Sequence, residues 1–105
     1  MNPSARLEKL QRLLDADPGD SFTRYALALE YFSREDAGMG IALLKQTIDG
    51  DPAYVPAYQM LGQQLARLGE SEEAAGILRR GIGVARAAGE THAASEMQDE
   101  LDELD

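Results

Sequence analysis

The chain has 105 residues, of which 44% are hydrophobic, so it can form one compact unit that buries roughly two-thirds of its unfolded surface. Nineteen acidic and ten basic residues give a net charge of −9, which disfavours nucleic acid as a partner because the phosphate backbone is repelled. Cysteine is absent, so neither a disulfide nor a thiolate zinc site is expected. No segment has the roughly 18 apolar residues of a membrane span, and the first residues lack the basic and then apolar run of a secretory signal. We therefore expect a cytoplasmic protein with no membrane partner.

Hydrophobic periodicity predicts three helices in the first half of the chain, at 3–16, 21–34 and 38–49. The first stops before the turn at Asp17 and Pro18, and Asp20 or Ser21 is suited to cap the second. The second helix carries two apolar stripes, which predicts burial on two sides. The third ends before Pro52, because a proline disfavours the helical conformation of the residue that precedes it.

Three more helices are predicted in the second half, at 54–68, 71–88 and 91–104. Gly69 is suited to end the fourth helix in a left-handed conformation, and Ser71 offers a side-chain cap for the fifth. Three glycines inside the fifth helix each cost roughly 1 kcal/mol of helix propensity, so we expect a neighbouring backbone to approach them closely; the alternative is that they leave the helix frayed or bent. They are Gly76, Gly81 and Gly83.

The hydrophobic pattern repeats with a period of 34 residues, since Asp17 and Pro18 recur as Asp51 and Pro52. The same offset relates several apolar or small positions: Leu10 and Leu44, Leu27 and Leu61, Ala28 and Gly62, Tyr31 and Leu65, Leu44 and Leu78, and Ile48 and Ile82. A fixed period of this length is typical of a helical repeat array. Such arrays present surfaces to partners, so the period predicts the architecture and leaves the ligand open.

Residues 21–88 resemble two tetratricopeptide repeats, whose pattern is W-x2-L-G-x2-Y, then A-x3-F, then P. The residues at the pattern positions are Leu27, Ala28, Tyr31, Gly40, Leu44 and Pro52 in the first repeat, and Tyr58, Leu61, Gly62, Leu65, Ala74 and Leu78 in the second. Arg24 replaces the usual aromatic residue, Gly40 the alanine, Leu65 the tyrosine and Arg86 the proline. The loss of the proline at Arg86 predicts a longer fifth helix.

The resemblance implies an all-α fold, a right-handed superhelical α-solenoid of antiparallel helix pairs. We expect a single domain over residues 1–105. Its parts would be a partial repeat helix at 1–20, repeats at 21–54 and 55–88, and a C-terminal capping helix at 89–105. Small residues would let paired helices approach, and leucines would fill the gaps between them.

In the family that the chain resembles, the first helix of each pair lines a concave groove. By that resemblance the ligand-binding residues are Tyr25, Leu29 and Phe32 of the first repeat, beside Phe22, Ala26 and Ser33, and Gln59, Met60, Gln63 and Arg67 of the second. Aromatic and methionine side chains supply contact area, glutamines bond to a peptide backbone, and Arg67 suits a carboxylate. The alternative is that neighbouring helices cover these side chains as core.

We therefore expect a non-enzymatic protein-protein interaction scaffold that binds a peptide or partner helix, of unknown identity, in its groove. Chaperone-cochaperone members of the family use a clamp of Lys, Asn and Arg, but Tyr25, Leu29 and Met60 stand near those positions, which argues against that ligand class. The alternative function is homo-oligomerisation through a seam in the C-terminal helix, formed by Ala94, Met97, Leu101 and Leu104. We instead expect Met97 and Leu101 to pack on the fifth helix of their own chain.

Other chemistry-bearing residues point to no catalytic residue, metal or cofactor. His92 is the only histidine and lies in an acidic segment, where a solvated role is expected. Asp15, Asp17 and Asp20 lack the loop spacing of a calcium site and suit turns and caps instead. The acids of the last helix, Glu96, Asp99, Glu100 and Glu103, are typical of a solvated face. A hydrolase or metalloenzyme would need a convergent cluster that the sequence does not offer.

Overall fold

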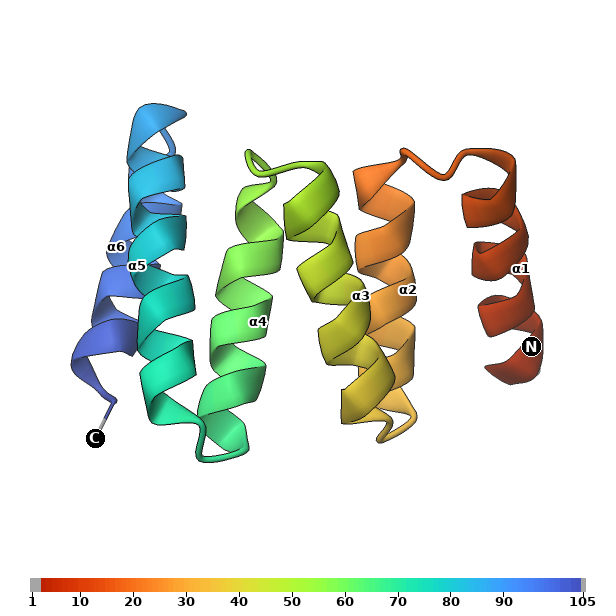
Figure 1. Cartoon of the computed structure of the whole chain (residues 1–105), viewed down its shortest axis with the longest axis horizontal. Coiled ribbons are helices and arrows are strands. Elements are labelled where there is room, and N and C mark those ends of the chain that lie inside the picture. Colours follow the sequence, from red (N-terminus) through yellow and green to blue (C-terminus); the bar gives the residue numbers. More distant parts are fainter. Residues whose placement is uncertain (1–2, 105) are drawn as a thin grey trace. The chain divides into compact units, whose positions relative to one another are not determined.

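The computed structural model describes residues 3–104, and within them the chain forms six α-helices and no strand (Figure 1). The helices are α1 (Pro3–Ala16), α2 (Ser21–Ser33), α3 (Ala37–Gly50), α4 (Val55–Arg67), α5 (Ser71–Ala87) and α6 (Thr91–Asp102). The predicted all-α repeat fold is confirmed, and every predicted helix end lies within two residues of the observed one. The chain divides into two compact units between Asp51 and Pro52.

The first unit holds α1, α2 and α3, of which α2 and α3 form an antiparallel pair (Figure 1). Leu27, Ala28 and Leu44 are fully buried in it, as the repeat pattern predicts. Polar contacts support this packing: Arg6 Nε of α1 lies 2.9 Å from Glu30 Oε2 of α2, and the Ser21 hydroxyl donates at 2.8 Å to Oδ2 of Asp51, which directly follows α3.

The second unit holds α4, α5 and α6, and α5 packs against both of its neighbours. Leu61 and Leu78 are fully buried between α4 and α5. A Cβ added at Gly62 would lie 2.6 Å from Leu78 Cδ2, so a larger residue has no room there. Met97 of α6 is also fully buried, and its sulfur would lie 2.7 Å from a Cβ at Gly81 of α5. The expected packing of Met97 on its own chain is confirmed.

Three interhelical turns share one hydrogen-bond pattern, in which two backbone amides after the helix bond back to its last turn. The residue that must adopt a positive φ is Glu35 after α2 (61°), Gly69 after α4 (81°) and Gly89 after α5 (75°). The prediction for Gly69 is thus confirmed. At Glu35 a side-chain-bearing residue occupies a conformation that favours glycine.

Two expectations for α5 are wrong. Ser71 is the first residue of the helix rather than its cap; the cap position is Glu70, and no side chain bonds to the free amides there. Of the three glycines, only Gly81 meets a neighbouring helix, because Gly76 and Gly83 have open space where a Cβ would stand. α5 has 17 residues, against 14 in α3, the equivalent helix of the first repeat. None of the helices described is long and apolar enough to cross a lipid bilayer.

Candidate functional site

The predicted binding residues of the first unit, Tyr25, Leu29 and Phe32, lie on α2 and are all half-buried. Phe32 is engaged within the helix pair, because its ring tip would lie 2.6 Å from a Cβ at Gly40 of α3. Burial raises the pKa of Tyr25 above its ordinary value of 10.0. Tyr25 and Leu29 are therefore available for contact through the exposed part of their side chains, whereas Phe32 mainly packs against α3.

The predicted residues of the second unit lie on α4. Gln59, Met60 and Gln63 are half-buried and Arg67 is exposed. The Gln59 amide donates to Glu100 Oε1 of α6 at 2.7 Å, so part of its hydrogen-bonding capacity is used within the unit. The Met60 sulfur accepts a weak hydrogen bond from Gln64 at 3.6 Å.

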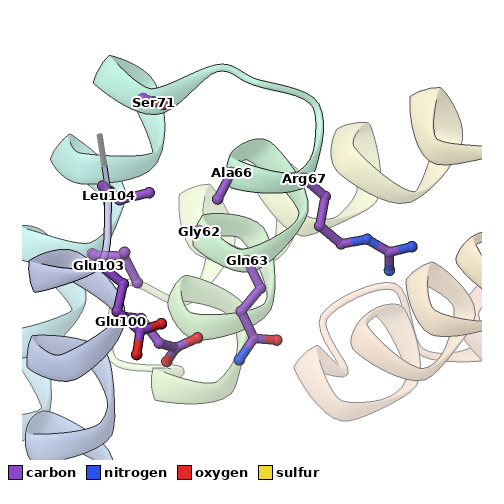
Figure 2. A pocket seen from close by; sticks show the side chains of 9 residues that line it. Gly62, Gln63, Ala66, Arg67, Ser71, Glu100, Glu103 and Leu104 are labelled. Atoms are coloured by element: carbon purple, nitrogen blue, oxygen red, sulfur yellow. The ribbon is translucent and has the colours of Figure 1, made fainter.

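A cavity of about 490 Å³ lies within the second unit, and it involves α4, α5 and α6 (Figure 2). Its volume is in the range of small ligand pockets. Two predicted binding residues, Gln63 and Arg67, line it. The remaining lining residues are Gly62, Ala66, Ser71, Leu78, Glu100, Glu103 and Leu104.

The hollow follows from small residues on α4. Leu78 packs directly on Gly62, whereas Ala66, one turn further along α4, has only a methyl group and leaves space on this face of the helix. The wall opposite is α6, which is held beside α5 by the burial of Ala94 and Met97. Close packing elsewhere in the unit therefore fixes the distance across the hollow.

The polar lining of the cavity is uneven in charge. Glu100 and Glu103 contribute carboxylates, and within residues 3–104 neither forms an ion pair. Figure 2 shows the Arg67 side chain extending away from both glutamates. One oxygen of Glu100 is fixed by Gln59, which orients that carboxylate. The arrangement offers hydrogen-bond acceptors and negative charge beside an apolar wall.

Seven lining residues were not predicted as ligand contacts: Gly62, Ala66, Ser71, Leu78, Glu100, Glu103 and Leu104. The sequence pattern predicts a solvated face for the two glutamates and a helix cap for Ser71. The spacing of Glu100 and Glu103 indicates that both lie on one side of the C-terminal helix. It does not indicate that this side faces α4. Leu104 gave the one usable signal, because it continues the apolar seam of Ala94, Met97 and Leu101.

The other candidates form no site in the part of the chain described. The side chain of His92 is 90% exposed and its Nε2 lies 3.5 Å from Glu96 Oε1. Asp20 caps α2 as expected: the Thr23 hydroxyl and the amides of Thr23 and Phe22 donate to it and lower the pKa of its carboxyl. Residues 3–104 contain no group of three or more His, Asp or Glu side chains placed to hold a metal ion.

Comparison with known proteins gives structural relatives. A tetratricopeptide repeat domain protein from Salinibacter ruber, solved in solution, is 40% identical with a TM-score of 0.77, over 81% of this chain and 86% of that one. A Bordetella parapertussis protein is 25% identical with a TM-score of 0.77, over 91% of this chain and 84% of that one. The TPR2B domain of yeast Sti1, in a complex with pHsp70, is 17% identical with a TM-score of 0.84, over 90% of this chain and 76% of that one.

No protein-family model matches the chain, and no curated protein matches it. The Salinibacter protein is nevertheless similar in both sequence and fold over most of the two chains. The Sti1 domain, at its lower identity, shows likeness of fold alone.

Proposed function

This chain belongs to the tetratricopeptide repeat family, and we propose that it binds a peptide or a helix of a partner protein on the first helices of its repeats. At the coarser level it is a protein-interaction scaffold, as its family is. We propose a non-catalytic role and a cytoplasmic location, with the partner's identity open.

The observation that carries the proposal is the cavity of the second unit. It places Gln63 and Arg67, predicted as ligand contacts, on one hollow surface with an apolar wall. A cavity that combines apolar area with a few polar groups is the usual form of a binding site. Gln63 supplies both a donor and an acceptor for a peptide backbone, and Arg67 is exposed and suited to a carboxylate.

On α2, Tyr25 and Leu29 offer a second, more apolar surface for the same kind of partner. Phe32 contributes less, because its ring is already in contact with α3. We assign Gln59 and Met60 a supporting part, since Gln59 is bonded to Glu100.

The alternative function, homo-oligomerisation through the α6 seam, has less support. Met97 is fully buried and Ala94 is nearly so within the unit. Only Leu101 and Leu104 keep half-buried side chains on that seam, too little apolar surface for a zipper. The seam is better suited to holding α6 in place as a cap.

Selection of peptides from a random phage-displayed library tests the proposal. Selected peptides should lose about tenfold or more in affinity on Gln63→Ala or Arg67→Glu, or on Tyr25→Ala or Leu29→Lys, with helicity preserved. Asp49→Ala, an exposed change on α3, is the control and should bind like the parent. Failure to select any peptide, or equal loss of structure and binding in all variants, would contradict the proposal.

A further inference from the structure

The cavity of the second unit has a charge pattern that goes beyond a general peptide surface. Two of its lining residues, Glu100 and Glu103, carry carboxylates without an ion-pair partner in the described part of the chain. The single cation of the lining, Arg67, extends away from them (Figure 2). A ligand that enters beside α6 thus meets negative charge.

The opposite side of the same cavity is apolar. Ala66 of α4 supplies it, beside the buried Gly62 and Leu78, and Leu104 adds half-buried apolar surface from beyond α6. A side chain that suits this cavity has a hydrocarbon stem and a polar end. Lysine and arginine have that form, because they bury their methylene groups along apolar surface and keep the charged head at the polar edge.

We infer that the cavity receives a lysine or arginine side chain of a partner protein, with the stem against Ala66 and Leu104 and the cation at Glu100 and Glu103. The inference rests on the proposed function and specifies its partner as a basic segment. Gln59 holds one oxygen of Glu100 at 2.7 Å and leaves the other for the ligand, so the acceptor is oriented before binding.

The other acidic residues of α6 strengthen the preference of the cavity for a basic side chain. α6 contains no lysine or arginine, and its other acids, Glu96, Asp99 and Asp102, add to the negative field at the cavity. An acidic ligand side chain would be placed against two carboxylates, an arrangement that suppresses wrong partners by like-charge repulsion. A wholly apolar side chain would fill the hollow but leave both carboxylates without a counter-charge.

Three acetylated, amidated tetrapeptides provide the probes: Leu-Lys-Leu-Ala, its glutamate analogue and its norleucine analogue. Titration of ¹⁵N-labelled protein, followed by amide chemical shifts, reports both the affinity and the place of binding. We expect the lysine peptide to shift amides of residues 62–67 and 100–104 and to bind about tenfold more tightly than the glutamate peptide. The norleucine peptide should fall between them.

A pair of double variants separates the site from the general field of the helix. Glu100→Gln with Glu103→Gln removes two charges from the cavity and keeps an acceptor for Gln59. Glu96→Gln with Asp102→Asn removes two charges from exposed positions of the same helix outside the cavity lining. The first variant should abolish the lysine preference, and the second should retain most of it.

The inference is overturned if lysine and glutamate peptides bind equally, if the two double variants weaken the preference alike, or if the lysine peptide shifts no amide near the cavity. The library selection distinguishes these failures from failure of the proposed function. Selected peptides that bind at Gln63 and contain no basic residue would uphold the binding role and refute the basic partner.

Discussion

Arg24 in the first repeat and Tyr58 in the second are equivalent positions, and each donates a hydrogen bond to the carbonyl of the proline six residues before it. The acceptors are Pro18 and Pro52, and the Tyr58 bond measures 2.7 Å. Tyr58 is nearly fully buried, while Arg24 is half-buried. The comparison shows that this position ties the helix to the preceding turn, and that a guanidinium replaces the family's aromatic residue in that task.

The repeats differ more in how they fill the space between paired helices. In the first, the Phe32 ring lies over Gly40. The equivalent residues of the second repeat are Ala66 and Ala74, and Ala66 lines the cavity. A large residue against a small one fills this part of the first pair. In the second pair Ala74 is fully buried, and the small Ala66 leaves room for the cavity that carries the proposed binding site.

The largest expected effect on stability comes from the core leucines that the two repeats share at equivalent positions. Leu27→Ala and Leu61→Ala each remove a fully buried leucine at equivalent positions, and each should lower the free energy of unfolding by about 2 to 5 kcal/mol. Urea unfolding combined with residue-resolved hydrogen exchange reports the loss in each unit. A parent-like Leu61→Ala variant would show that the common register assigned to the repeats is wrong.

Substitution of the glycines of α5 should change the stability of the second unit in opposite directions, depending on whether a neighbouring helix covers the position. Gly81→Ala should destabilise the second unit by about 1 to 3 kcal/mol, because the new methyl group would crowd the Tyr58 Cβ and the Met97 sulfur. Gly76→Ala and Gly83→Ala should stabilise it by about 0.5 to 1 kcal/mol each, since both positions face open space. Thermal unfolding of the three variants gives the signs, and a stable Gly81→Ala would contradict the packing of α6.

The proline-carbonyl bonds provide a smaller effect. Tyr58→Phe should cost about 0.5 to 1.5 kcal/mol, because it leaves the Pro52 carbonyl without its donor. Arg24→Met should cost less, because Arg24 is partly exposed and water replaces the lost bond. Chemical unfolding measures both, and a larger loss for Arg24→Met would reverse the ranking argued here.

The turns between paired helices give the smallest effect. Glu35→Gly should stabilise the first unit by up to about 1 kcal/mol, since glycine adopts the positive φ of this turn without strain. Gly69→Ala, at the equivalent turn, should destabilise the second unit by a similar amount. Melting temperatures that move in the same direction would show that turn conformation does not govern these positions.

The frame of the fold was predictable because it depends on local patterns. Helix periodicity, the Asp-Pro pairs and the 34-residue offset specify the helices and the leucines between them. The site was only partly predictable. Gln63 and Arg67 follow from the first-helix rule of the family, but Glu100 and Glu103 enter the cavity only because α6 packs beside α5. Periodicity identifies faces of a helix and leaves unspecified which neighbour each face meets.

Phe32 illustrates the same limit. Its helix position suits a groove, yet its contact partner is Gly40, a pairing that depends on the geometry of α2 against α3. The glycines of α5 are a further example, because the sequence alone predicts the same close approach of a neighbouring helix at all three. Only the position of α6 distinguishes Gly81 from Gly76 and Gly83.

Filling the cavity tests its role most directly. The double variant Ala66→Phe with Ala74→Gly transfers the Phe32–Gly40 pair of the first repeat to the second, with Ala74→Gly alone as the control. Fluorescence anisotropy with a peptide selected against the parent chain measures the affinity. We predict a loss of about tenfold or more for the double variant, a parent-like affinity for the control, and retained helicity in both. Parent-like affinity in a folded double variant would contradict the assignment of binding to this cavity.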